Sequence, residues 1–328
     1  MTEEAAGHGP AGPQAAPGAW RFPTVFRPDR LSIGLVMPMT EAIVRTPDPA
    51  RQFAHAALAD RLGFAALWVR DVPLNAPGYP DPVGHLDPWV HLGALAALTT
   101  RIALVTGAIV SPLRHPLHVA KGAMSADVVS RGRLILGLGS GDRPLEFAAF
   151  EQGYAERARH FRRDWERIAA ALKRPSRILF EGGDAQEEFE MRPGPTYGSV
   201  PMLTVGSAQQ TLEWIARNAD GWVTYHRPLE VQRGRYTLWR NAVDRVAAGQ
   251  VRSFSSAFNL RLDEDPGAPP EAIALGYRLG RKALIAMLEQ HRDMGVHHVM
   301  FNLTETGRPV DQVLEELGRD VLPLFHRD

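Results

Sequence analysis

Short apolar runs alternate with amphipathic stretches along most of this chain. Eight runs are rich in aliphatic and aromatic residues, as expected of strands buried on both faces. These predicted strands cover residues 31–37, 65–69, 102–106, 134–138, 202–205, 221–224, 256–262 and 298–303. Strands of this kind indicate a parallel sheet, whose neighbouring strands are joined by crossover helices.

Helical periodicity fills most of the intervals between these runs, with apolar residues three or four positions apart. The predicted helices cover residues 49–62, 89–98, 116–129, 157–172, 211–218, 236–248, 276–294 and 310–317. Strand–helix alternation repeated eight times predicts an α/β fold, a (β/α)8 TIM barrel. The alternative is an open doubly wound sheet. Such a sheet carries a glycine fingerprint after its first strand, where this chain has Met37-Pro38-Met39.

The barrel is expected to occupy residues 22–328 as a single domain, because α/β barrels commonly have this length. Residues 1–21 are rich in Ala, Gly and Pro. They cannot bury enough apolar surface to offset the entropy lost on ordering, so we expect a flexible N-terminal tail.

Composition excludes several classes of function. Lys+Arg and Asp+Glu both number 37, so no basic excess indicates binding to nucleic acid or to a membrane surface. The absence of cysteine excludes disulfides, thiolate metal sites and a cysteine nucleophile. Asp87, Asp142, His85 and His91 have no spacing typical of a metal site. The sequence has neither an apolar run of membrane-spanning length nor a secretory signal, so a cytoplasmic location is expected.

In a barrel, functional residues follow the carboxyl ends of the strands. Ser140 and Gly141 lie in a glycine-rich loop after one strand, where the backbone can approach a ligand closely. The turn from Gly206 to Thr211 precedes a helix expected to begin near Gln209, and free N–H groups there suit a phosphate. Ser207 could equally cap that helix, and the two roles are compatible.

Two strand ends supply candidate acid–base groups. Asp71, beside Arg70, could belong to a catalytic pair or to an ordinary salt bridge. His226 is the one histidine expected directly at the barrel mouth, as a proton donor or as a structural residue. The proline-rich loop 263–271 could form part of a lid or be a plain surface loop.

The strand-end motifs together resemble the bacterial luciferase-like family of flavin-dependent oxidoreductases. The matching segments are Gly63-Phe64-Ala65-Ala66-Leu67-Trp68-Val69-Arg70-Asp71, Thr106-Gly107-Ala108-Ile109-Val110-Ser111-Pro112, His115-Pro116, Asp127, Ser130-Arg131-Gly132-Arg133-Leu134-Ile135-Leu136-Gly137-Leu138-Gly139, Val205-Gly206-Ser207-Ala208-Gln209-Gln210-Thr211 and Ala219-Asp220-Gly221-Trp222. The resemblance extends from about Leu31 to the C-terminus.

This resemblance implies a luciferase-like barrel that binds FMN or a deazaflavin at its mouth. By resemblance, the small residues Thr106, Gly107 and Ala108 lie near the flavin ring, and a non-prolyl cis bond joins Gly107 to Ala108. The remaining cofactor-binding residues expected at the mouth are Met39, Ser140, Gly141, Gly206, Ser207, Ala208 and Thr211. The resemblance also implies a homodimer, and the expected catalytic residues are Asp71 and His226.

The leading hypothesis is an FMN-dependent monooxygenase that uses O2 and reduced flavin, supplied by a separate flavin reductase, on a small organic substrate. Luciferases carry Glu-His after the second strand, where this chain has Asp71-Val72, so a luciferase-type base is in doubt. Near the phosphate, this chain has Ser140 in place of an arginine, and Arg143 could compensate. The alternatives are a deazaflavin-dependent hydride-transfer oxidoreductase and a flavin-binding protein without turnover.

Overall fold

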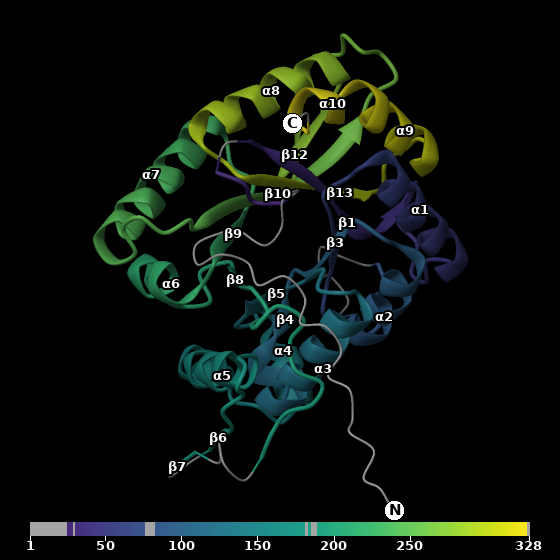
Figure 1. Cartoon of the computed structure of the whole chain (residues 1–328). Helices are drawn as coiled ribbons and strands as arrows, with labels where there is room; N and C mark the ends of the chain where they lie inside the picture. The colour runs from purple at the N-terminus through teal and green to yellow at the C-terminus, as the bar shows by residue number, and fades with distance from the viewer. Residues whose placement is uncertain (1–24, 29, 76–82, 181–182, 185–188, 327–328) are drawn as a thin grey trace, which may run out of the picture.

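Eight parallel strands form a closed ring at the centre of the molecule (Figure 1). Strand β10 pairs with both β9 and β13, which closes the ring. The strands of the ring are β1 (Ser32–Thr40), β2 (Ala66–Val69), β3 (Ala103–Thr106), β5 (Leu134–Gly139), β8 (Met202–Val205), β9 (Gly221–Tyr225), β10 (Ser253–Leu262) and β13 (His298–Thr304). The predicted (β/α)8 barrel is confirmed, and each of its eight predicted strands is present.

The computed structural model of the chain describes residues 25–28, 30–75, 83–180, 183–184 and 189–326. The expected flexible tail, residues 1–21, lies outside the described residues, so the division into tail and domain stays a prediction. Two short strands, β6 (Leu179–Phe180) and β7 (Gly183–Asp184), form a hairpin outside the ring. None of the helices within the described residues is both long and apolar enough to cross a membrane.

Helices surround the ring on its outer side (Figure 1). They are α1 (Pro49–Leu62), α2 (Pro88–Leu98), α3 (Pro116–Val129), α4 (Pro144–Ala149), α5 (Arg157–Ala171), α6 (Leu212–Asn218), α7 (Leu229–Val246), α8 (Arg281–Met294), α9 (Val310–Asp320) and α10 (Leu322–Phe325). Proline at the first position sets the start of α1, α2 and α3, because the N–H it lacks would have no intrahelical partner there. Side chains of the preceding residues, Asp48, Asp87 and His115, cap these helices.

The predicted helix over residues 276–294 is wrong in its first part. Residues Gly276–Leu279 form strand β12, which pairs with β10 and with β11 (Glu271–Ile273). A Cβ at Gly276 would lie 1.9 Å from the Asn259 backbone oxygen, so only glycine lets β12 approach β10 this closely. The helix itself begins at Arg281.

Two further helix starts differ from the prediction. Helix α7 begins at Leu229 instead of Tyr236, because its first turns carry few apolar residues that would reveal the periodicity. The helix predicted over residues 211–218 is α6, which begins at Leu212 with Thr211 as its N-cap, so it does not extend back to Gln209. Ala208 and Gln209 have left-handed φ values of 47° and 59°, which a helix cannot contain.

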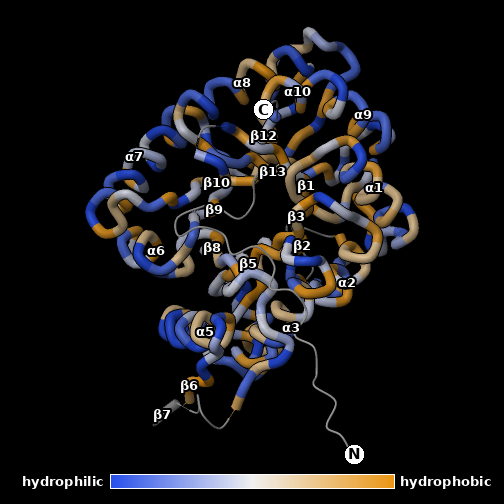
Figure 2. The backbone as a smooth tube through the Cα atoms, in the orientation of Figure 1, coloured by the Kyte–Doolittle hydropathy of each residue, from blue (hydrophilic) through white to orange (hydrophobic). Residues whose placement is uncertain are grey.

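Side chains along each strand alternate between two apolar layers. Figure 2 shows hydrophobic residues gathered at strands of the ring, such as β1, β5 and β13. The inner layer fills the ring and includes Trp68, Val105 and Met300. The outer layer separates the strands from the helices. Phe26, which precedes β1, packs beneath the inner layer against Trp68 and closes the amino-terminal end of the ring.

Candidate active site at the carboxyl ends of the strands

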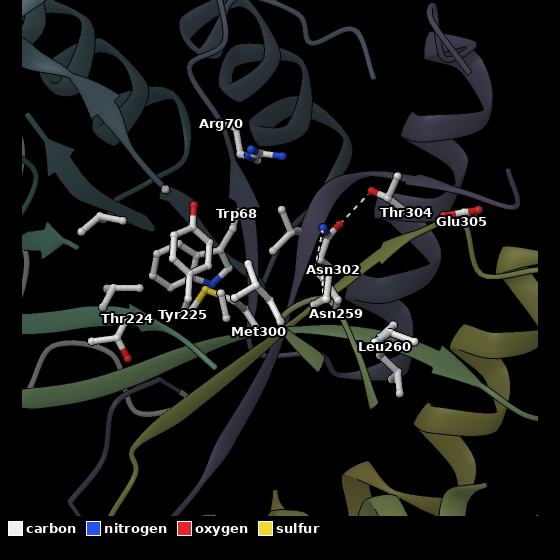
Figure 3. A pocket seen from close by; sticks show the side chains of 18 of the residues that line it. Trp68, Arg70, Thr224, Tyr225, Asn259, Leu260, Met300, Asn302, Thr304 and Glu305 are labelled. Carbon is white, nitrogen blue, oxygen red and sulfur yellow. Dashed lines mark hydrogen bonds between the residues drawn. The ribbon is translucent and has the colours of Figure 1, made fainter. Parts of the chain in front are cut away.

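A cavity of about 340 Å³ opens at the carboxyl ends of the strands (Figure 3). Its deep part is apolar and is formed by Trp68, Val36 and Met300. A cavity of this volume, mostly apolar with a few polar groups, is typical of a small-molecule site. The barrel mouth therefore holds the candidate active site, as the sequence predicts.

Most of the lining residues follow the alternation of the strands. Even-numbered residues of β2 and β13 face the cavity, and so do odd-numbered residues of β9 and β10. The cavity-facing members are Trp68, Arg70, Tyr225, Ala257, Asn259, Arg261, Met300, Asn302 and Thr304. Thr224 and Leu260 also line the cavity, although they have the opposite parity.

A continuous line of hydrogen bonds crosses the polar wall of the cavity. Thr304 Oγ1 donates to Asn302 Oδ1 (2.8 Å), Asn302 Nδ2 donates to Asn259 Oδ1 (3.0 Å), and Asn259 Nδ2 donates to the Ala274 carbonyl (2.7 Å) (Figure 3). Asn302 and Asn259 are direct partners in the β13–β10 register. Each amide keeps one N–H and one lone pair for other partners, so this wall can both donate to and accept from a ligand.

Charged groups lie around the upper part of the cavity. Arg70 projects from the end of β2 into the space above Trp68 (Figure 3). On the opposite side, Arg261 pairs with Glu305. A ligand that enters here passes one arginine and one ion pair before it reaches the apolar floor.

The peptide bond between Gly107 and Ala108 is cis, which confirms the expectation from resemblance. Gly107 lines the cavity, and a Cβ at this position would lie 2.8 Å from Trp68 Cε3. Thr106, by contrast, is fully buried, and its hydroxyl bonds the N–H and the C=O of Gly137 at 2.8 Å each. Its hydroxyl therefore joins β3 to β5.

Asp71 lies outside the cavity, in a buried ion pair. Its side chain is 2% exposed. It accepts from Arg114 Nε (2.9 Å) and Nη2 (2.8 Å) and from the Val110 N–H (3.1 Å). Of the two roles considered for Asp71, the structure shows the salt bridge, and its partner is Arg114 instead of Arg70. The expected catalytic position of Asp71 is corrected. Trp68 and Arg70 face the cavity, and position 71 alternates with them, so its side chain points away from the cavity.

His226 also lies away from the cavity. Its ring is 95% buried and packs edge-on against Phe258 (4.8 Å) and Tyr277 (5.4 Å), and it stacks with His291 (5.9 Å). Burial, with a smaller effect of His291, lowers the pKa of His226 to about 4, so the ring is neutral at pH 7. The expected position at the mouth is corrected, because the neighbouring Tyr225 lines the cavity whereas the ring of His226 packs between Phe258 and Tyr277.

Met39, expected near the cofactor, also belongs to the outer layer. It is fully buried there, and its N–H and C=O bond the side chain of Gln52 at 2.8 and 2.7 Å. Its parity in β1 is opposite to that of Val36, which lines the cavity.

The remaining predicted residues lie on two loops beside the cavity. Ser140 is buried at the end of β5, and Gly141 has a left-handed φ of 77°. Gly206 lines the cavity with a φ of 67°, and Ser207 is exposed and accepts from the Gln209 N–H (3.3 Å). Because β5 and β8 are neighbours in the ring, these loops lie close together.

Three other residues expected near the cofactor lie at different points of the structure. Ala208 is buried, and Thr211 caps α6 by accepting from the Trp214 N–H (3.2 Å). Arg143, expected to compensate near the phosphate, pairs with Glu146 at 3.0 Å. The guanidinium of Arg143 is therefore paired with a carboxylate of α4.

Sequence reasoning missed the residues of the polar wall, Asn259, Asn302 and Thr304, and gave Arg70 only a partner's role. A signal for them exists. Asn259 and Asn302 each interrupt a strand at an inward position, where a polar side chain needs a partner. Residues 263–271, expected as a possible lid, do not line the cavity. Ile273, Ala274 and Leu275 of the β11–β12 hairpin line it instead.

Comparison with known proteins indicates one family. The profile of luciferase-like monooxygenases matches residues 30–265. An uncharacterised protein of Mycobacterium tuberculosis is 34% identical over 197 residues, covering 54% of this chain and 68% of that protein. The F420-dependent hydroxymycolic acid dehydrogenase of the same organism is 29% identical over 211 residues, covering 62% of this chain and 55% of that enzyme.

Two solved structures have similar folds. The monooxygenase RslO1 from Streptomyces bottropensis superposes with a TM-score of 0.72 at 20% identity, covering 89% of this chain and 99% of its own. The coenzyme F420-dependent tetrahydromethanopterin reductase from Methanopyrus kandleri gives 0.70 at 17%, covering 90% and 99%. The near-equal scores show that this fold serves both kinds of enzyme.

The buried ion pair gives a first test. Asp71→Asn leaves the Arg114 charge without its buried partner, so we expect a loss of about 3 kcal/mol in the free energy of unfolding. Asp87→Asn is the matched control. Asp87 pairs with the same arginine at 3.1 Å but is 45% exposed, so its loss should stay below about 1 kcal/mol. Denaturant unfolding measures both. An Asp71→Asn protein of unchanged stability would contradict the structural role.

Proposed function

Because the chain belongs to the luciferase-like monooxygenase family, we propose that it is an oxidoreductase that uses the deazaflavin coenzyme F420 to transfer hydride to or from a small organic substrate. The observation that carries this choice is the similarity to F420-dependent dehydrogenases. That similarity is 29% identity over 62% of this chain. The flavin-dependent trigonelline monooxygenase of Acinetobacter baylyi is 31% identical but covers only 29% of this chain, so the extent of the match supports F420.

The cavity fits the ring of a flavin or deazaflavin. Its apolar floor, Trp68 and Met300, suits a flat aromatic face, and Gly107 adds a surface without a side chain. Bound there, the cofactor supplies a ring carbon that accepts or releases hydride, and the protein holds the ring and orients the substrate. The amides of Asn302 and Asn259 then face the substrate and can bond an oxygen atom of it.

We place the phosphate of the cofactor between the loop at Ser140–Gly141 and the turn at Gly206–Ser207. Gly141, Gly206 and Ala208 have left-handed φ values. Backbone of this conformation in a loop can present successive N–H groups to an anion. Exposed Ser207 offers a hydroxyl at the same place. In this assignment, main-chain donors replace the arginine of the luciferases.

An FMN-dependent monooxygenase is the second candidate. Its support is the superposition on a monooxygenase along nearly the whole barrel. This candidate requires O2 and a supply of reduced flavin from a separate reductase. It also requires that the cavity exclude water, to which the apolar residues Ile273 and Leu275 of the hairpin would contribute.

We further propose a homodimer formed through α2 and α3, which lie side by side (Figure 1). Helix α2 contains no Asp, Glu, Lys or Arg, yet Val90 and Leu98 are 67% and 47% exposed. Val128 and Val129, at the end of α3, are 41% and 57% exposed. An apolar face of this kind on a water-exposed surface favours burial against a second copy.

Titration of the purified protein decides between the two cofactors. We expect F420 to bind at least about tenfold more tightly than FMN, with tight binding seen as quenching of cofactor fluorescence and a shifted absorbance band. Hydride transfer is then followed by the loss of F420 absorbance with candidate alcohols. Tighter binding of FMN, with substrate-dependent oxygen consumption, would support the monooxygenase instead.

The phosphate position is tested by Ser207→Asp. The new carboxylate stands against the phosphate, so cofactor affinity should fall about tenfold or more. Ser207→Ala is the control, because it removes one turn-stabilising hydrogen bond without adding charge. Its affinity should stay within about threefold of the wild type. Equal affinities for Asp and wild type would place the phosphate elsewhere.

The dimer is tested by Val90→Glu, which adds a charge to the apolar face. Light scattering should give about twice the chain mass of 36.1 kDa for the wild type and the single-chain mass for the variant. Leu145→Glu is the control, because Leu145 is 74% exposed on α4, which is not one of the two helices of this face. A wild-type monomer, or a dimer of the Val90→Glu protein, would contradict the proposal.

A further inference from the structure

A buried chain of hydrogen bonds holds the floor of the cavity from below. The Trp68 indole N–H donates to His298 Nε2 (3.0 Å), and the Nδ1 of the same ring lies 2.7 Å from Ser32 Oγ. Ser32 Oγ in turn donates to the His297 carbonyl (3.0 Å). Trp68, His298 and Ser32 are all at most 1% exposed.

The direction of this chain follows from its donors. An indole N–H can only donate, so Nε2 of His298 accepts and carries no proton. The proton of the neutral ring is therefore on Nδ1 and is donated to Ser32, whose own proton goes to the carbonyl. Burial lowers the pKa of His298 to about 3, so this arrangement persists at neutral pH.

Packing leaves the imidazole no alternative orientation. Its ring stacks on Trp68 (5.7 Å between centroids, 28° between planes), and Phe26 meets it edge-on at 5.2 Å. Across the strand pair, a Cβ at Gly34 would lie 2.7 Å from His298 Nε2. The absence of a side chain at Gly34 makes room for the ring.

The other edge of the indole reaches the proposed cofactor position. Trp68 Cε3 would be 2.8 Å from a Cβ at Gly107, so the indole lies directly against the backbone that precedes Ala108. Any rotation of the indole would shift either this backbone or the apolar floor. Its orientation therefore sets the shape of the surface on which a flat ring would rest.

We propose that His298 is a positioning residue, which fixes the indole of Trp68 as the floor of the cavity and, through it, the Gly107–Ala108 strand end. This inference rests on the proposed function only in taking a flavin-type ring as the ligand. A role in packing alone would need no imidazole, because an apolar side chain fills a barrel core without polar partners. The polar chain adds a directional restraint on the indole.

The first measurement is the indole N–H resonance of Trp68, assigned by its loss in Trp68→Phe. In the wild type and in His298→Gln, whose amide oxygen can accept the same hydrogen bond, we expect slow exchange with deuterium. In His298→Phe, which keeps a ring but no acceptor, exchange should be about tenfold faster, as expected for one lost hydrogen bond.

The second measurement is affinity for F420 and FMN. His298→Phe should bind the preferred cofactor about tenfold more weakly, and His298→Gln should restore binding to within about threefold. His297→Gln is the matched control. His297 directly precedes β13 and is 6% exposed, but its Nδ1 accepts from the Phe254 N–H on the outer side. Its affinity should equal that of the wild type.

The positioning role is wrong if His298→Phe binds the cofactor with wild-type affinity although exchange of its indole N–H is faster. It is also wrong if indole exchange in His298→Phe is unchanged. Thermal unfolding by circular dichroism verifies that each variant is folded. If His298→Phe does not fold, His298→Asn replaces it, since its shorter amide reaches Ser32 but not the indole. If the wild type binds neither cofactor, the proposed function fails, whereas the exchange rates still decide whether His298 holds Trp68.

Discussion

Strict alternation of side chains in a closed ring of parallel strands determines which residues of this protein can do chemistry. Inward positions face the packed interior or the cavity, and most outward positions face a helix. The change from Arg70 to Asp71 is therefore a change from the cavity wall to a buried ion pair. The same alternation puts Tyr225 at the cavity and His226 in the outer layer.

This constraint also explains how much could be predicted from the sequence. The periodicities of helices and strands predict the barrel, because burial repeats along each element. The motif around Gly107 and Gly206 predicts two of the cavity-lining positions. Residue type and nearness to a strand end both favour Asp71 and His226, whereas their place in the strand alternation disfavours them. The pairing of Asp71 with Arg114 joins positions 43 residues apart, which no local pattern can reveal.

The β11–β12 hairpin escapes prediction from the sequence for a different reason. Residues 276–294 contain enough apolar residues at helical spacing to predict a helix throughout. What prevents the helix from starting at Gly276 is tertiary: the backbone there approaches Asn259 too closely for any side chain. Pairing with β10 therefore overrides the local preference, and the hairpin contributes Ile273 and Leu275 to the cavity.

Unequal strand lengths give the cavity its two different walls. Strands β2 and β3 each have four residues and end at the level of the apolar floor, whereas β10 has ten. From Asn259 onward, β10 pairs with β12 and rises above the ring, with Asn259 and Arg261 directed inward. A flat ring can thus enter over the low side and lie on Trp68, while the high side offers amides to a second molecule. An oxidoreductase that brings a cofactor ring against a small polar substrate needs such a division, and in this protein it follows from where each strand ends.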